Sequence, residues 1–147
     1  LLADVEKLKK MCEEKGKNAY LDLPNFATME DIACLKEILN KTKINIVANN
    51  YYAFAFDNKK IVGAGLNVYN NISASVFDVE VLTAESDIST KIKFPYMTLR
   101  HCPMKANLGA NCASCSYEDG YFYKMDNSKL LKLKRKKIKS CTFYLTD

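Results

Sequence analysis

The stretch AYLDLPNFATMEDIACLKEILNKTKINIV, residues 19–47, determines the predicted fold because it holds a strand, a helix and a second strand in close succession. Ala19–Leu23 is rich in apolar residues and predicts the first strand. Thr28 is a favourable N-cap for the helix, with Asp31 in its first turn. Lys43–Val47 predicts the second strand. The helix between them is expected to bury Ile32, Leu35, Ile38 and Leu39.

The same alternation continues towards the C-terminus. Ile61–Leu66 and Val79–Leu82 predict a third and a fourth strand, and Asn49–Phe56 and Asn70–Phe77 predict helical connections. Strands that alternate with helices at short intervals are typical of parallel sheets. Four such units make about half of an eight-stranded barrel, which needs about 250 residues. We therefore expect an α/β fold, with residues 1–91 forming a partial TIM-type βα barrel whose partner is the remaining N-terminal part of the same barrel.

The pattern changes after residue 91. Ile92–Leu99 predicts a strand, and Cys102–Cys115 is rich in Gly, Asn and Ala and predicts a loop. We expect residues 92–147 to form a Cys-rich, metal-binding appendage built on an antiparallel β ribbon. Its other predicted strands are Tyr121–Met125, Leu131–Lys134 and Cys141–Leu145.

Four of the six cysteines lie in this last third, in the spacing Cys102-x9-Cys112-x2-Cys115-x25-Cys141. A C-x2-C pair holds one metal between two thiolates, and two further cysteines complete a four-coordinate site. Soft thiolates fit zinc and equally a four-iron four-sulfur cluster. We expect zinc in the isolated chain, because zinc is redox-inert. The alternatives are unpaired buried thiols and disulfides, and the remaining cysteines, Cys12 and Cys34, are expected to be small core residues.

Composition limits the function classes. The chain has 147 residues, of which 48% are hydrophobic and 27% charged, and no apolar run in the sequence is long enough to span a bilayer. Cysteine clustering favours a metal in a reducing compartment, and therefore a cytoplasmic protein. His101 is the only histidine, which excludes a zinc hydrolase site of the two-histidine kind within these residues. No Gly-x-Ser-x-Gly string is present.

Several polar residues are candidates for substrate contacts. Asn67, Tyr69 and Asn70 follow the third predicted strand, at the end that faces the active site in barrel enzymes. The alternative is that they form turns and caps. Glu85 follows the fourth strand and is a weak candidate for a catalytic base, or else a helix N-terminal acid. Arg100 is a candidate anion ligand near the metal.

Positive charge is concentrated in one segment. Lys129–Lys139 contains seven basic residues and no acid, so with a net charge of +5 the rest of the chain sums to −2. The simple interpretation is a strand with a solvated basic side. The alternative is an RNA-contacting strand, with bases stacking on Tyr121, Tyr123 and Tyr144.

Three strings in order resemble the C-terminal half of the collagenase-like U-thirty-two peptidase family. They are Gly65-Leu66-Asn67-Val68-Tyr69-Asn70, then Leu82-Thr83-Ala84-Glu85, then Tyr96-Met97-Thr98-Leu99-Arg100-His101-Cys102-Pro103. The resemblance continues through the C-x2-C pair to Cys141 and covers roughly Tyr20 to the end of the chain.

The resemblance implies a truncated TIM-type barrel and a peptidase. It also implies an alternative, because several members of the family support RNA or quinone hydroxylation with iron–sulfur clusters on four cysteines. The family's usual Ser-Pro-Glu string is Thr83-Ala84-Glu85 here, so only the acid is retained. Two hypotheses follow: the metal-bearing part of such an enzyme, or a non-catalytic binding module with an architectural zinc.

Overall fold

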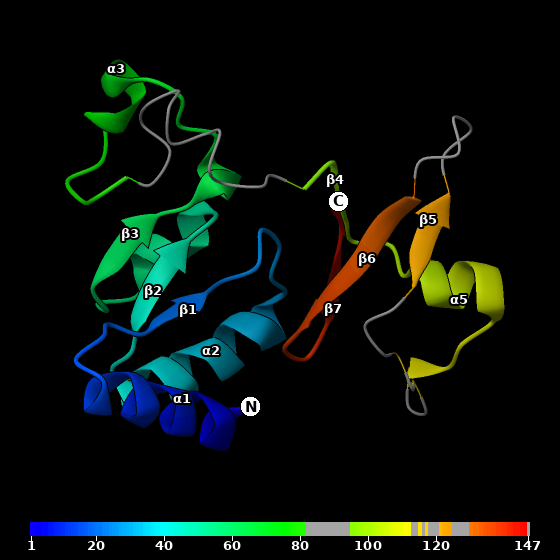
Figure 1. Cartoon of the computed structure of the whole chain (residues 1–147), viewed down its shortest axis with the longest axis horizontal. Helices are drawn as coiled ribbons and strands as arrows, with labels where there is room; N and C mark the ends of the chain where they lie inside the picture. Colours follow the sequence, from blue (N-terminus) through cyan, green and yellow to red (C-terminus); the bar gives the residue numbers. More distant parts are fainter. Residues whose placement is uncertain (82–94, 113–114, 116, 118–120, 125–129, 147) are drawn as a thin grey trace. The chain divides into compact units, whose positions relative to one another are not determined.

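The chain is divided into two compact units, unit 1 at Leu1–Ile92 and unit 2 at Lys93–Asp147. The computed structural model describes residues 1–81, 95–112, 115, 117, 121–124 and 130–146, with only the backbone of 122–124 (Figure 1). The predicted boundary between residues 91 and 92 lies outside the described residues, so each unit is described by itself. Along the described part of the chain, no helix has the length and apolar composition needed to span a membrane.

Unit 1 contains a three-stranded parallel sheet in the order β1-β2-β3. Leu21 of β1 pairs with Ile46 of β2, and Val47 pairs with Ile61 of β3. Val81 adds a single parallel bridge to Val62, where a fourth strand was predicted. The parallel pairing confirms the α/β pattern, but a barrel is not seen among the described residues of unit 1. The strands span Tyr20–Asp22, Asn45–Ala48 and Lys60–Val62.

The helices of unit 1 are α1 (Leu2–Glu14) and α2 (Met29–Thr42), and α2 begins where the sequence predicts. The Thr28 hydroxyl accepts a hydrogen bond from the Asp31 backbone N–H, and the Asp31 carboxylate accepts one from the Thr28 backbone N–H. This reciprocal pair satisfies two N–H groups that a helix start leaves unpaired. Of the apolar residues expected in the core, Leu35, Ile38 and Leu39 are buried and Ile32 is half-buried.

The connections after β2 and β3 are shorter than predicted. Tyr51–Ala55 is a 3₁₀ helix, η1, and a second one, η2, occupies Ala64–Leu66. The expected strand over residues 61–66 therefore ends at Val62. A four-residue helix, α3 (Asn71–Ala74), lies inside the predicted helical segment.

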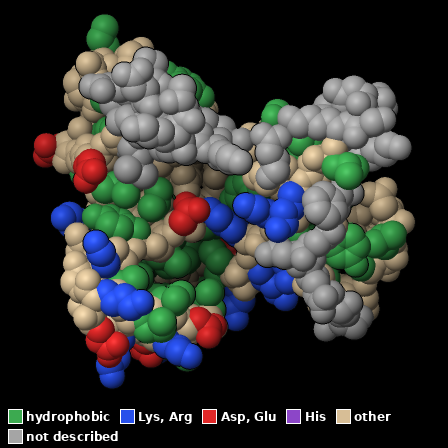
Figure 2. Space-filling view, viewed as in Figure 1, with side chains coloured by type: hydrophobic (Ala, Val, Ile, Leu, Met, Phe, Trp, Pro, Cys, Tyr) green, Lys and Arg blue, Asp and Glu red, His purple; other side chains and the backbone are tan. Residues whose placement is uncertain are grey.

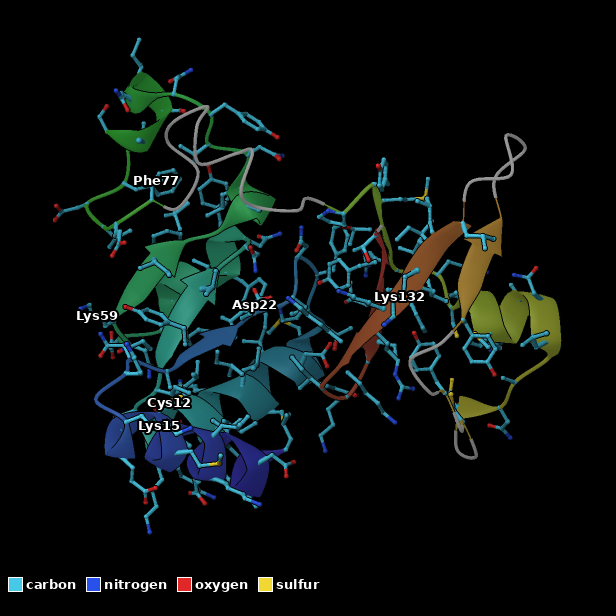
Figure 3. All side chains as sticks on the ribbon, viewed as in Figure 1. Cys12, Lys15, Asp22, Lys59, Phe77 and Lys132 are labelled. Atoms are coloured by element: carbon cyan, nitrogen blue, oxygen red, sulfur yellow. The ribbon has the colours of Figure 1, made fainter. Side chains whose placement is uncertain are left out.

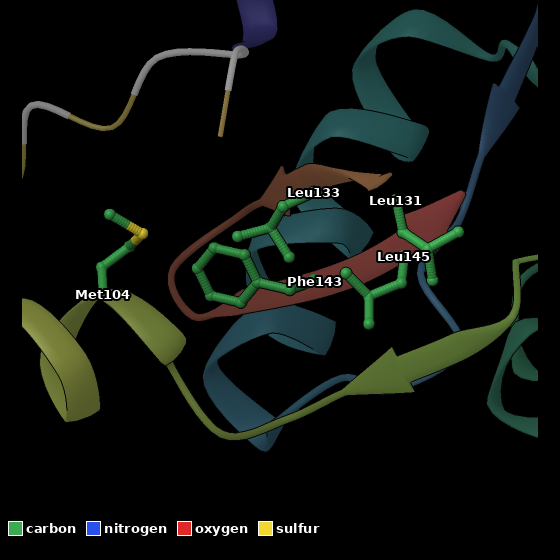
Figure 4. Packing of buried hydrophobic residues seen from close by; sticks show 5 residues of the cluster. All are labelled: Met104, Leu131, Leu133, Phe143 and Leu145. Carbon is green, nitrogen blue, oxygen red and sulfur yellow. The ribbon is translucent and has the colours of Figure 1, made fainter. Parts of the chain in front are cut away.

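Unit 2 contains a four-stranded antiparallel sheet in the order β4-β7-β6-β5, which confirms the predicted ribbon. The strands span Met97–Leu99 (β4), Phe122–Lys124 (β5), Leu130–Lys137 (β6) and Cys141–Thr146 (β7). One face of β6 and β7 carries the core of the unit, and Met104 reaches it from α5 (Pro103–Leu108) (Figure 4). The buried cluster consists of Met104, Leu131, Leu133, Phe143 and Leu145.

The helix α5 corrects the prediction of a loop over residues 102–115. Pro103 occupies the first turn, where its missing N–H costs no hydrogen bond, and Gly109 ends the helix with a left-handed φ of 62°. Met104 is buried, so tertiary packing stabilises a helix too short to form alone.

Candidate metal centre

Cys102 and Cys141 lie against the same small core. Cys102 is the N-cap residue of α5, and its Sγ accepts a hydrogen bond from the Lys105 backbone N–H at 3.4 Å. Cys141 begins β7 and pairs with Lys137 of β6. Both side chains are half-buried and pack against the cluster of Met104, Leu131, Leu133, Phe143 and Leu145.

The surroundings of Cys141 also bring in Cys115. Burial raises the pKa of the Cys141 thiol above its ordinary value. The positive charges of Arg135 and Lys137 act in the opposite direction, and nearby Cys102 and Cys115 raise the pKa further. Cys102 and Cys115 are therefore near enough to Cys141 to influence its ionisation.

Cys112 is the fourth predicted ligand. It is exposed and precedes Cys115 by three residues, and the two residues between them lie outside the described part of the chain. Cys115 is half-buried, and its Sγ accepts a long hydrogen bond from Arg135 Nη1 at 3.7 Å.

A closed four-sulfur site is not present in the geometry. Within the described residues, which include all four cysteines, no group of three or more His, Cys, Asp and Glu side chains is arranged to hold a metal ion. The predicted four-cysteine site is therefore not shown, although Cys102 and Cys141 pack against the same core. The four side chains differ in their burial, since Cys112 is exposed and the other three are half-buried. The donor set itself fits a soft metal, because all four groups are thiols and two have C-x2-C spacing.

The other two cysteines lie in unit 1, whereas the single histidine adjoins Cys102 in unit 2. Cys12 is on α1 and Cys34 is on α2, both in unit 1, and both are half-buried rather than fully buried core residues. His101 is exposed beside Cys102.

The predicted substrate contacts have local structural roles. Asn67 has a left-handed φ of 53° at the end of η2, and its Oδ1 accepts a hydrogen bond from the Tyr69 hydroxyl at 3.3 Å. Asn70 is the N-cap of α3, and its Oδ1 accepts a hydrogen bond from the Ser73 backbone N–H at 2.8 Å. Arg100 is exposed, next to β4. Substrate binding by these residues stays a prediction, and Glu85 lies outside the described residues.

A polar contact that the sequence analysis missed joins the ends of the three parallel strands. Buried Asn49 follows β2, and its Nδ2 donates hydrogen bonds to the Asp22 carboxylate and, at 2.7 Å, to the Leu23 carbonyl. Its Oδ1 accepts a hydrogen bond from the Gly65 backbone N–H at 3.2 Å. A Cβ at Gly63 or Gly65 would collide with Asn49. The glycine pair therefore permits close packing on Asn49, and Asp22 is labelled at this edge in Figure 3.

The lysines of β6 alternate with its core residues. Lys132, Lys134 and Lys136 share the face opposite Leu131 and Leu133. Figure 2 shows Lys and Arg side chains gathered where β6 runs, and Figure 3 labels Lys132 on that strand.

The tyrosines expected to stack on RNA do not form one surface. Tyr144 is buried, and Lys136 Nζ lies 5.1 Å from its ring centroid. Tyr121 stacks on Tyr117 with a centroid distance of 5.6 Å, and Tyr117 packs against the core of unit 2. The side chain of Tyr123 lies outside the described residues.

Comparisons with protein-family models, with curated proteins and with solved structures find no match to this chain.

Proposed function

We propose that unit 2 is a metal-binding module in which the thiolates of Cys102, Cys112, Cys115 and Cys141 hold one zinc ion. A four-iron four-sulfur cluster on the same ligands is the alternative. The observation that supports this proposal is the packing of Cys102 and Cys141 against one small core, to which the C-x2-C spacing of Cys112 and Cys115 adds. Closing the site requires the approach of the exposed Cys112 to the other three thiols.

The small core gives the module a reason to bind metal. Among its described residues the buried cluster has five members, and small domains commonly gain stability from a metal or disulfides. When four thiolates bind zinc, no coordination position stays open, so the ion supplies stability rather than catalysis. Thiols of this kind are maintained in a reducing compartment, so we propose a cytoplasmic location.

We further propose that the chain is the C-terminal part of a protein of the collagenase-like U-thirty-two type. The parallel sheet β1-β2-β3 supports a partial TIM-type barrel, with β1 as the edge on which the remaining N-terminal part would continue the sheet. An enzymatic role, as a peptidase or as an RNA hydroxylation factor, would then depend on the complete barrel. Glu85 is the one catalytic candidate that the chain offers for it.

Elemental analysis and absorbance spectra of anaerobically and aerobically purified protein test the metal proposal. We expect about one zinc per chain and no visible absorbance, or a brown protein if a cluster is bound. Cys115→Ser and Cys141→Ser should lose the metal, while Cys12→Ser, a matched change in unit 1, should retain it. Absence of metal from protein purified under reducing conditions, or equal metal content in all variants, would contradict the proposal.

RNA binding is a second candidate, favoured by the three lysines on one face of β6. With Tyr144 buried, the proposed contact is electrostatic and uses Lys132, Lys134 and Lys136 on phosphates. Binding of a single-stranded RNA should then weaken as salt rises, with a logarithmic slope of about 0.7 for each phosphate contacted. Replacing the three lysines by Met should reduce this slope, whereas Lys36→Met on α2 should not. RNA binding that is insensitive to salt would exclude this role.

A further inference from the structure

Arg135 is a positively charged side chain in contact with one of the candidate thiols, Cys115. It lies on β6 and pairs with Phe143 of β7. Side chains two residues apart on a strand point to the same face, so Arg135 shares the core face of the sheet with Leu131 and Leu133. The neighbouring pair along this face is Lys137 and Cys141, which places Arg135 diagonally across from Cys141.

The guanidinium is held by contacts with a single aromatic residue. Its Cζ lies 4.5 Å from the centroid of the Tyr117 ring, and its Nη2 donates a hydrogen bond to the Tyr117 carbonyl at 3.4 Å. These two contacts orient the remaining Nη1 towards Cys115 Sγ, 3.7 Å away. A guanidinium with two of its donors directed at different acceptors has little rotational freedom.

Tyr117 is itself fixed by the sheet. Its hydroxyl donates a hydrogen bond to the Leu133 carbonyl, and its ring meets Phe143 edge-on at a centroid distance of 5.7 Å. Arg135 is therefore positioned by the core of unit 2 through Tyr117, independently of any ligand.

We infer that Arg135 is a positioning residue of the thiolate site, donating an N–H···S hydrogen bond to Cys115 and balancing the negative charge of the metal-bound sulfurs. This inference rests on the proposed metal-binding function. Four thiolates on one divalent ion carry a net charge of −2, which is costly in a half-buried place without a cation nearby. Arginine suits this task because it stays protonated and directs N–H groups in fixed directions. Hydrogen bonds to metal ligands orient the ligands and strengthen binding.

The test compares zinc affinity among variants of the full chain by competition with a chromophoric chelator under reducing conditions. Arg135→Met should weaken zinc binding by about 10- to 100-fold, the range for loss of a partner of a metal ligand. Arg135→Lys keeps the charge without the planar fork, so a smaller loss is expected. Lys36→Met removes one positive charge at an exposed position of α2 in unit 1, and it should leave the zinc affinity unchanged.

Each result has a distinct meaning. Arg135→Met with the same affinity as Lys36→Met would overturn the inference and leave the metal proposal intact. If Arg135→Met does not fold even with zinc, Arg135→Lys decides, and an affinity equal to that of the unchanged chain would overturn the inference. Absence of any zinc or cluster on the unchanged chain would instead end the proposed function, and the inference with it.

Discussion

Units 1 and 2 differ in how much apolar surface each buries. Among the described residues, unit 1 buries aliphatic side chains from α1, α2, β2 and β3, whereas unit 2 buries one cluster of five hydrophobic residues and Tyr144. Burial of apolar surface is the main source of folding stability, so unit 1 has the larger share. The buried hydrophobic residues of unit 1 are Val5, Leu23, Leu35, Ile38, Leu39, Ile44, Ile46, Ala48, Ala53, Phe56, Ile61, Val62 and Val68.

The polar contacts of the two units differ in kind. In unit 1 they are amide and carboxylate hydrogen bonds, such as those of Asn49 and of Thr28 with Asp31. In unit 2 the contacts near the small core involve sulfur and a guanidinium, as at Cys115 and Arg135. Sulfur contacts change with redox state and metal, and amide contacts do not. Unit 1 should therefore be stable under conditions that unfold unit 2.

Metal removal is expected to have the largest effect and to act on one unit only. Treatment with a strong zinc chelator under reducing conditions should remove the protection of backbone amides in β6 and β7 from hydrogen exchange. The reason is that the binding free energy of a structural metal contributes to the folding free energy. The strands β1 to β3 and helix α2 should keep their protection. Hydrogen exchange read by mass spectrometry of peptides separates the two units. Equal protection of unit 2 with and without chelator would contradict the contrast between the units.

Replacing Asn49 is expected to have the next largest effect, a loss in the free energy of unfolding of unit 1. Asn49→Asp keeps the acceptor for the Gly65 N–H but replaces the donor Nδ2 by an oxygen that faces the Asp22 carboxylate and the Leu23 carbonyl. A buried acceptor left unpaired costs about 1–3 kcal/mol, and the like charge of Asp22 adds to it. Urea unfolding followed by far-UV circular dichroism should show this loss.

Asn18→Asp is the matched control, because Asn18 is exposed between α1 and β1. It should change the free energy of unfolding by less than about 0.5 kcal/mol. Equal losses in the two variants would show that the strand ends do not depend on Asn49. Zinc content should be unchanged in both, since all four candidate ligands lie in unit 2.

How much of the fold could be predicted depends on whether an element is determined by residues nearby in the sequence or by distant ones. The start of α2 at Thr28 is encoded within four residues, and the sequence identifies it. The end of β3 at Val62 depends on Asn49, thirteen residues earlier, so the expected strand over residues 61–66 extended too far. Helix α5 was missed because its stability comes from buried Met104, whereas its composition is typical of a loop.

For the candidate site, spacing identified the cysteines but not their partner. Arg135 is one of seven basic residues in a run, and nothing in the run distinguishes it. Only the register of β6 against β7 places it on the core face, while Lys134 and Lys136 face the other way. The RNA hypothesis placed Tyr121 and Tyr144 on neighbouring strands as stacking partners for bases. Sequence alone does not assign the two rings to a face of the sheet, and the structure places Tyr121 on Tyr117 and Tyr144 beside Lys136.

Loss of the α2 cap is the smallest effect expected, and it tests whether unit 1 is governed by local contacts. Thr28→Ala removes the hydroxyl that accepts a hydrogen bond from the Asp31 N–H and donates one to the Asp31 carboxylate, both within 3.2 Å. Removing an N-cap side chain costs about 1 kcal/mol, and buried Asp31 would retain the hydrogen bond from the Thr28 backbone N–H. Thr28→Ser retains the hydroxyl and should lie close to the unchanged chain in urea unfolding. Because the cap is confined to one turn of α2, exchange in β6 and β7 should not respond, and a response there would mean that the two units do not unfold independently.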